Sequence, residues 1–341
     1  VDRYRIPPKE VGELLPQQAL MLEVAREALA DAQLQPVDPS RAGVFIGLGL
    51  DLRTTDFHFR WSMLKQAGQL AERHLPEASE AGKASWIQQL IESAGPPLTA
   101  DRTMGALAGT NASRIAKEFH FGGQSYTVCS EDCSGIRALE IAVRALQQGE
   151  VDQALAGAVD LTGDVRALLA TDAIQPYSRS GAACPFDTNS DGVVPGEGAV
   201  GVVLKRLHDA RRDGDRIYSI IRGVGVASGE IGGHRDLSAS YARALERAYQ
   251  DAGVQPGSVG YVEAHGNGHP EQDEKEAKAL AAFFDEAKRT TARRISSASA
   301  DVGHTGATSG LVSIARASLA LYREVLPPLR GLRQPLEAMS S

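Results

Sequence analysis

Apolar positions along the chain follow two alternating spacings, which predict helices and strands in turn. Residues 16–32 carry apolar side chains at helical spacing, and residues 42–48 form a short apolar run typical of a strand. The alternation continues, with strands expected at residues 124–128, 152–159, 198–205, 216–228, 260–264 and 295–300, and helices at residues 110–119, 134–146, 238–253, 274–286 and 307–324. Such alternation indicates parallel β-sheet covered by helices. The two halves of the chain look like two copies of one plan.

Residues 55–100 differ from this pattern. They contain helical fragments rich in Gln, Glu, Ala and Lys, with Phe57, Phe59 and Trp61 at their start. We interpret them as a helical insertion into a single domain of residues 1–341, not as a second domain.

The segment from Tyr126 to Gly135 predicts a strand that turns sharply into a buried helix. A cysteine at such a turn would have its pKa lowered by the helix N-terminus and would be a nucleophile. The residue at the turn is Asp132, which we expect to cap the helix with its carboxylate. Cys129 lies at the strand end and is expected to be buried, and Cys133 follows the turn. An ionised, capping carboxylate is a poor acyl acceptor.

Composition excludes several classes of partner. The net charge of −7 gives no electrostatic case for nucleic acid or an anionic membrane, and no apolar run is long enough to span a bilayer. The three cysteines lack metal-binding spacing and fit a reducing, cytoplasmic location. The scarcity of aromatic residues, at 5%, predicts a core of aliphatic side chains.

Four glycine-flanked segments carry the candidate chemistry. They are the turn at Asp132 and the segments 184–199, 263–269 and 301–306. His265 and His304 each follow a predicted strand directly. Loops at the carboxyl ends of parallel strands gather at one edge of a sheet, so we expect the two histidines to line a common pocket. Asp187 and Glu197, in the second segment, are expected to brace loops through hydrogen bonds.

Together these segments resemble the β-ketoacyl synthase family, which has the thiolase fold. Residues 265–269 resemble its His-Gly-Thr-Gly-Thr motif, and residues 299–304 its Lys-Ser-Asn-Ile-Gly-His motif. Phe186-Asp187 with the later Gly-Glu-Gly resembles another family signature, and residues 15–18 resemble its Asp-Pro-Gln-Gln. The resemblance covers nearly the whole chain in order.

The resemblance implies an α/β fold of five layers, αβαβα, with two related halves. It implies a homodimer or heterodimer with a ketosynthase, in which the strand before the turn pairs across the dimer axis. Substrates would be carried on the phosphopantetheine of an acyl carrier protein, with no cofactor bound by the domain itself. Compared with the family, residues 1–341 lack an opening strand and a closing strand.

The departures from the family pattern carry the functional prediction. The family's Thr-Val-Asp-Thr-Ala-Cys falls on residues 127–132, so the catalytic cysteine maps to Asp132, and the motif lysine maps to Ser299. His265 and His304 remain, and in the family they bind the thioester carbonyl. The resemblance therefore predicts a non-condensing partner of an active ketosynthase, a chain-length factor that shapes the acyl tunnel. It is closest to such domains of polyunsaturated fatty acid or polyketide synthases.

Two alternatives stay open at this point. Loss of the thiol does not prevent decarboxylation of a malonyl carrier protein, because His265 and His304 can still polarise the carbonyl. A condensing enzyme acylated on Cys133 is the other alternative, if the turn is shifted by one residue.

Overall fold

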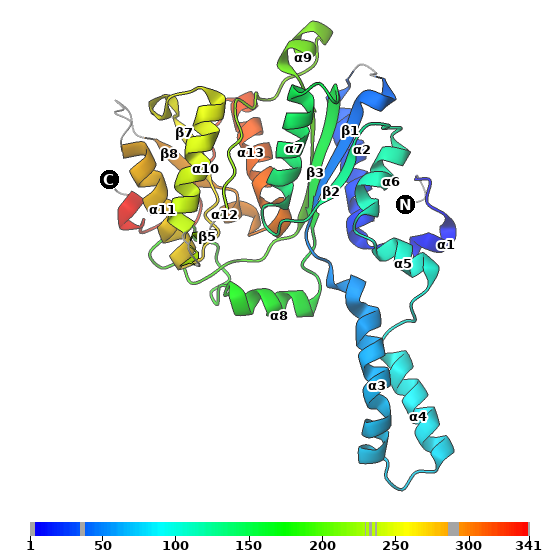
Figure 1. Cartoon of the computed structure of the whole chain (residues 1–341). Coiled ribbons are helices and arrows are strands. Elements are labelled where there is room, and N and C mark those ends of the chain that lie inside the picture. Colours follow the sequence, from blue (N-terminus) through cyan, green and yellow to red (C-terminus); the bar gives the residue numbers. More distant parts are fainter. Residues whose placement is uncertain are drawn as a thin grey trace.

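The helices and strands form five layers in the computed structural model (Figure 1). Two helical layers lie outermost, each packs on a sheet, and a further helical layer separates the two sheets. This order of layers agrees with the expected αβαβα architecture. The structure describes residues 4–34, 38–228, 230–231, 234–235, 237–285 and 293–339.

The larger sheet has the strand order β2-β1-β3-β4. Strand β1 pairs in parallel with both β2 and β3, and β4 is antiparallel to β3. Every residue of β1 is buried, because helices cover both faces of the sheet. The four strands are β1 (Ala42–Leu48), β2 (Ser125–Val128), β3 (Gln153–Asp160) and β4 (Gly198–Lys205). One face of the sheet is covered by α2 (Pro16–Ala32) and α6 (Thr110–Glu118), and the other by α7 (Ser134–Gln147) and α13 (Ser309–Arg323).

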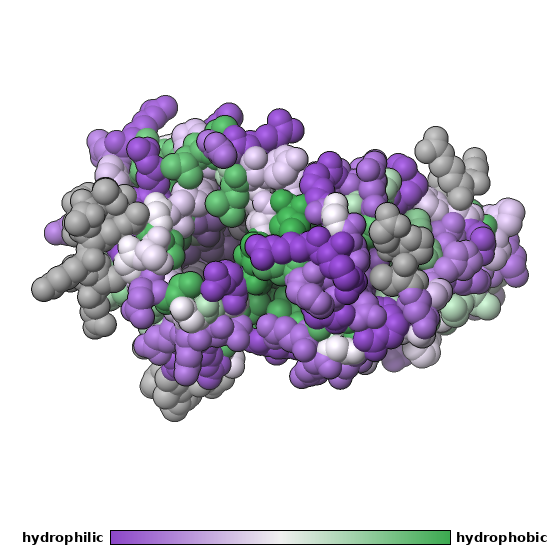
Figure 2. Space-filling view, turned by 90° about the horizontal axis from the view of Figure 1, so that it is seen from above, coloured by the Kyte–Doolittle hydropathy of each residue, from purple (hydrophilic) through white to green (hydrophobic). Residues whose placement is uncertain are grey.

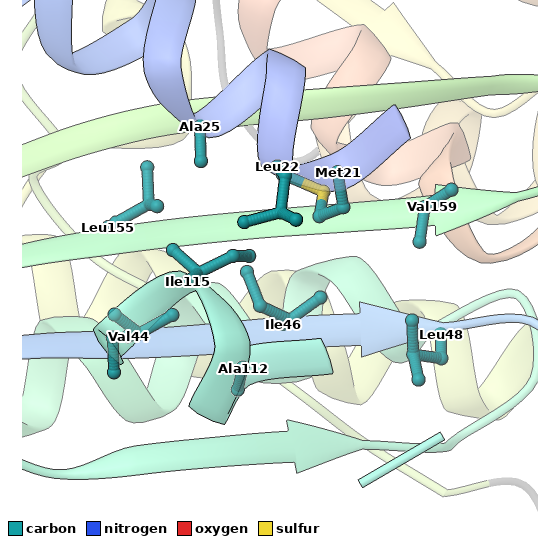
Figure 3. Packing of buried hydrophobic residues seen from close by; sticks show 11 residues of the cluster. Met21, Leu22, Ala25, Val44, Ile46, Leu48, Ala112, Ile115, Leu155 and Val159 are labelled. Atoms are coloured by element: carbon teal, nitrogen blue, oxygen red, sulfur yellow. The ribbon is translucent and has the colours of Figure 1, made fainter. Parts of the chain in front are cut away.

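The core between this sheet and its outer helices is aliphatic, as the composition predicts. Figure 3 shows Met21, Leu22 and Ala25 of α2 above the strands, with Ile115 of α6 among the β1 and β3 side chains. Ile115 is fully buried. A buried side chain of this kind contributes about 1.5–3 kcal/mol through the area it removes from water.

The second sheet consists of two parallel strands, β7 and β8. Its outer face is covered by α10 and α11, and Phe186 and Phe284 lie in the core between them. The bounds are β7 (Tyr261–Ala264), β8 (Arg294–Ser297), α10 (Leu237–Ala252) and α11 (Pro270–Asp285). The helix predicted at residues 274–286 corresponds to α11, and its predicted last residue, Glu286, lies outside the described residues. The remaining short elements are α1 (Pro8–Val11), α5 (Ala100–Ala106), α8 (Val165–Ile174), α9 (Leu207–Asp213), β5 (Glu230–Ile231), β6 (His234–Arg235) and α12 (Ser299–Val302).

Helices α3 (Asp56–His74) and α4 (Glu80–Ser93) form an antiparallel hairpin that projects from the body of the molecule (Figure 1). Lys83 of α4 contacts Glu72 of α3 at 2.8 Å. The guanidinium of Arg60 donates hydrogen bonds to the carbonyl oxygens at the end of α4. Both helices lie within residues 55–100, the segment for which the sequence predicts helical fragments. No helix among the described residues has the length and apolar character needed to cross a bilayer.

The strand predicted at residues 216–228 is wrong. This segment pairs with no strand in the described part of the chain, and side chains hydrogen-bond to its backbone instead. The Asp251 carboxylate accepts from the N–H of Val224 at 2.9 Å, and Arg247 donates to the carbonyl of Val226 at 2.6 Å. Its β-branched residues favour a strand, but strand pairing requires a neighbour that the sequence pattern does not reveal.

The packing of this segment against α10 gives a test of the fold. A Cβ on Gly225 would lie 2.1 Å from the carbonyl oxygen of Ala244, so Gly225→Ala forces the segment away from the helix. We expect the free energy of unfolding to fall by about 1–3 kcal/mol, the usual cost of overpacking. Gly68 of α3 has open space around it, and Gly68→Ala should raise stability by about 0.5–1 kcal/mol. Chemical denaturation measures both, and equal effects would contradict the close packing.

Candidate functional site

The turn between β2 and α7 is held by its own backbone and by Ser134. The Ser134 hydroxyl donates to the carbonyl of Glu131 at 2.6 Å and accepts from the N–H of Ser130 at 2.8 Å. Glu131 has a φ of 50°, a left-handed conformation that costs a non-glycine residue about 1–2 kcal/mol. This sharp reversal leaves the side chain of Asp132 free of the helix it precedes.

The expected capping role of Asp132 is wrong. Helix α7 begins at Ser134, so Cys133 occupies the N-cap position, and it makes no side-chain capping bond. The helix starts where the sequence pattern predicts, but its N-cap position lies one residue after Asp132. The Asp132 carboxylate instead faces His304.

Two glycines bring the start of α7 close to its neighbours. A Cβ on Gly47 of β1 would lie 2.4 Å from the carbonyl carbon of Ser134. A Cβ on Gly135 would lie 2.8 Å from the carbonyl oxygen of Ala307, in the short 3₁₀ turn after His304. This close approach of α7 to the 3₁₀ turn places Asp132 beside the histidine loop.

His304 lies in a loop fixed on both sides. Its N–H donates to the carbonyl of Val194 at 2.7 Å, and its own carbonyl accepts from Gly196 at 2.9 Å. The ring atom Nδ1 accepts from the N–H of Gly306 at 3.0 Å, so the proton of the neutral imidazole lies on Nε2. That Nε2 is 3.2 Å from Oδ2 of Asp132, within ion-pair distance although not aligned as a regular hydrogen bond.

His265 completes the cluster. Its ring centroid lies 5.2 Å from that of His304, with the two rings nearly perpendicular at 88°. Burial, with a further contribution from His304, lowers the pKa of His265 to about 4, against the opposing attraction of Asp132. His265 is therefore neutral at physiological pH.

Asp132 is an anion within this cluster. Burial acts to raise the pKa of Asp132, but the contact with His304 and the electrostatic attraction of the two histidine rings hold that pKa below its usual range. Its side chain is 49% exposed, so the carboxylate is also open to the surface. The Asp132 carboxylate therefore lies against the N–H of His304. Without this carboxylate, the N–H would be available to an oxyanion.

Cys133 has a different environment. Burial and the neighbouring charge of Asp132 raise the pKa of the Cys133 thiol, with Arg137 opposing. The thiolate is the nucleophilic form, so this environment disfavours nucleophilic attack at neutral pH. Cys129 is exposed, contrary to the expectation that it is buried, because β2 is an edge strand.

Two buried carboxylates that sequence reasoning missed hold the loop of His265. The Glu276 carboxylate accepts from the N–H groups of His265 and Gly266 at 2.8 and 2.9 Å, and Asp273 accepts from Gly268 at 3.2 Å. Burial raises the pKa of Glu276 to about 7 and that of Asp273 to about 6. The signal in the sequence is a pair of acids three residues apart on α11, directly after the glycine-rich loop.

Serine hydroxyls support the same loop from β8 and α12. Ser297 donates to the carbonyl of His265 at 2.7 Å, and Ser299 donates to it at 3.2 Å. Ser299, at the position of the family's lysine, therefore contributes a neutral hydrogen bond to this loop. His269 is not part of the cluster, since its Nδ1 accepts from Gln272 in the first turn of α11.

Asp187 braces a loop, as expected. It accepts from the N–H groups of Asn189, Arg333 and Gln334 at 2.6–2.8 Å, and although burial opposes them, these bonds lower its pKa to about 2. Glu197 accepts a longer bond of 3.3 Å from Thr162. No group of three or more His, Cys, Asp or Glu side chains in the described ranges is placed to hold a metal ion.

Both halves of the chain match models of known protein families. Residues 3–210 match the family described as Beta-ketoacyl synthase, N-terminal domain, and residues 218–333 match Beta-ketoacyl synthase, C-terminal domain. The chain belongs to the β-ketoacyl synthase family.

Relatives of this ketosynthase-type domain include parts of large synthases. The chain is 31% identical over 341 residues to the pikromycin polyketide synthase component PikAIII of Streptomyces venezuelae, covering 98% of this chain and 20% of that protein. It is 31% identical over 338 residues to the polyketide synthase ThaG of Burkholderia thailandensis, covering 96% of this chain and 5% of that protein. The chain therefore spans a small part of the curated relatives that it matches.

A solved ketosynthase has the same fold. The ketosynthase from module 6 of the bacillaene synthase from Bacillus subtilis 168 superposes with a TM-score of 0.79 at 25% identity, covering 99% of this chain and 52% of that chain. The thiolase-like α/β fold predicted from the sequence is thereby confirmed.

The depressed pKa of His265 makes stability depend on pH. An unfolded histidine has a pKa of about 6.5, so as pH falls from there toward 4 the unfolded chain binds a proton that the folded chain does not, and stability is lost. We expect the unfolding free energy of the wild type, relative to His265→Gln, to fall by up to about 3 kcal/mol between pH 7 and pH 4. Urea denaturation at each pH measures the difference.

The comparison with His265→Gln is needed because Glu276 and Asp273 have raised pKa values and act with the opposite sign. A difference between the two proteins that does not change with pH would contradict the depressed pKa of His265.

The raised pKa of Cys133 predicts slow alkylation. In a Cys129→Ser, Cys184→Ser background, we expect Asp132→Asn to speed iodoacetamide modification of Cys133 several-fold at pH 7.5, because the neighbouring charge is removed and more thiolate forms. Glu274→Gln, which removes a charge on the exposed face of α11, serves as the control. Intact-mass kinetics measure the rates, and equal rates for Asp132→Asn and its parent would refute this account.

Proposed function

We propose that this domain is a non-condensing partner of a ketosynthase, a chain-length factor that helps to form the acyl tunnel of a fatty acid or polyketide synthase. The observation that carries the proposal is Asp132, which stands at the turn before α7 and faces His304 at 3.2 Å. A carboxylate at this position does not provide the thiolate that acyl transfer requires. Acyl groups would reach the partner on the phosphopantetheine of an acyl carrier protein, without a cofactor bound to this domain.

The free edge of β2 supports the proposed pairing. β2 is the outermost strand of its sheet, and Tyr126 on it is 47% exposed. An edge strand of this kind presents unpaired backbone groups that another strand can bind. A ketosynthase, either identical or different from this chain, would pair its corresponding strand with β2.

The charge of Asp132 also argues against efficient decarboxylation. Loss of carbon dioxide from a malonyl thioester leaves an enolate, whose oxyanion needs hydrogen-bond donors. His304 Nε2 is already in contact with the Asp132 carboxylate, and this carboxylate would repel both the malonyl carboxylate and the enolate. The two retained histidines nevertheless make malonyl-carrier decarboxylation the second candidate function.

A malonyl-carrier assay distinguishes these functions. We expect the wild-type chain to form no acetyl carrier protein above the buffer rate, as measured by mass spectrometry of the carrier. Asp132→Asn should raise this rate at least tenfold, because the neutral amide frees His304 and removes the repulsion. The added mutation His304→Ala should abolish the gain, and Glu274→Gln should leave the wild-type rate unchanged.

Two outcomes would replace the proposal. Acetyl-carrier formation by the wild type that is lost in His304→Ala would identify a decarboxylase. An acyl adduct that is lost in Cys133→Ser would identify a condensing enzyme acylated on Cys133.

A further inference from the structure

The carboxylate of Asp160 lies at the same edge of the larger sheet as the loop of His304. β3 ends at Asp160, and in Figure 1 the chain leaves the lower end of this strand toward α8. Figure 2 views the molecule from above, where hydrophobic residues line a hollow near the centre. Asp160, which is half-buried, therefore lies at the end of the sheet opposite to the face seen in Figure 2, on the side of the polar site.

Two glycines allow this carboxylate to approach the backbone on both of its sides. A Cβ on Gly49, directly after β1, would lie 2.2 Å from Oδ1 of Asp160, and a Cβ on Gly306 would lie 2.2 Å from Oδ2. Both separations are far shorter than van der Waals contact, so neither position accepts a side chain while Asp160 keeps its place. The carboxylate therefore lies between the end of β1 and the loop of His304.

The same carboxylate binds the backbone of that loop. Oδ2 of Asp160 accepts a hydrogen bond from the N–H of Ala307 at 2.8 Å, in the 3₁₀ turn Gly306–Thr308. The preceding N–H, that of Gly306, donates to Nδ1 of His304 at 3.0 Å. The two amides are consecutive and peptide groups are planar, so holding one amide restricts the direction of the other.

The hydrogen bond at Nδ1 decides where the ring of His304 donates. In a neutral imidazole, the nitrogen that accepts a hydrogen bond carries no proton, and the proton lies on the other nitrogen. The Gly306 N–H thus keeps the proton on Nε2, which is 3.2 Å from Oδ2 of Asp132. His304 is held from two sides, by Asp132 at Nε2 and, through the backbone of residues 306–307, by Asp160 at Nδ1.

We propose that Asp160 is a positioning residue of this site. By binding the amide next to the one that His304 uses, it fixes the ring with its Nε2–H toward Asp132. The inference deepens the proposed function and rests on it, because it explains how the histidine donor is kept against the carboxylate at the turn. A carboxylate that merely braced β3 against the loop would affect stability without affecting the tautomer of His304.

Nitrogen NMR of the histidine ring tests this role in the 341-residue chain labelled with ¹⁵N-histidine. The His304 signals are assigned by their loss in His304→Gln, and the tautomer is measured on the high-pH plateau of the titration, where the ring is neutral. We expect the Nε2–H tautomer in the wild type. Asp160→Ala should lower the ratio of the Nε2–H to the Nδ1–H tautomer about fivefold, the factor that one ordinary hydrogen bond supplies, because the released amides turn away from Nδ1.

Conservative and matched variants separate positioning from packing. Asp160→Asn retains an oxygen that accepts from Ala307, and should keep the wild-type tautomer. Asp164→Ala removes another carboxylate that accepts from a backbone N–H at 2.8 Å, that of Arg166, and should leave the His304 ring unchanged. Gly49→Ala should displace the Asp160 carboxylate from its other side and shift the tautomer as Asp160→Ala does. This variant decides the question if Asp160→Ala does not fold.

Three results would overturn the proposal. An unchanged tautomer in folded Asp160→Ala or Gly49→Ala would reduce Asp160 to a brace. An equal change in Asp160→Asn would show that its charge acts, and not its hydrogen bond to the loop. An equal change in Asp164→Ala would show a general loss of stability. The NMR signals do not depend on acetyl-carrier formation, so a failure of the proposed function in the carrier assay and a failure of this inference are distinguishable.

Discussion

The beginning of α7 lies between β1 and the loop of His304 at separations that side chains do not permit. Gly47 and Gly135 provide these contacts from the two sides, so the helix, the sheet and the second histidine loop approach one another through backbone alone. This constraint sets the position of the turn that carries Asp132, because the turn leads directly into the helix. The distance between Asp132 and His304 is therefore a property of the packed layers more than of the two side chains.

Ionisation divides the site into parts with different tasks. Asp132 keeps its charge next to a histidine, whereas burial keeps His265 neutral. Behind His265, the carboxylates of Glu276 and Asp273 use backbone N–H groups as partners where a cation would ordinarily compensate a buried acid. The framework that orients the histidines is thus elaborate and intact, while the group at the turn is not a nucleophile. This combination fits a domain whose shape is retained for a partner.

Local patterns in the sequence predicted most elements correctly, and failed where distant residues decide the outcome. The apolar spacing of residues 16–32 and the apolar run of residues 42–48 each define an element by themselves, and α2 and β1 have those bounds. Residues 216–228 have the composition of a strand, but α10 side chains satisfy their backbone. The three residues of the site were found because glycine-flanked loops follow strands. Glu276 escaped notice because an acid on an amphipathic helix ordinarily faces water.

The hairpin of α3 and α4 shows how much freedom the fold allows at one connection. It lies between β1 and β2, which pair directly although they are far apart in the sequence. The entropy of closing a connection rises only with the logarithm of its length, at about 0.6 kcal/mol for each doubling. The hairpin also satisfies much of its own hydrogen bonding, as Lys83 and Arg60 show. A long, self-supporting excursion therefore costs the sheet little, and this segment is free to diverge in length and surface while the geometry around Asp132 stays constant.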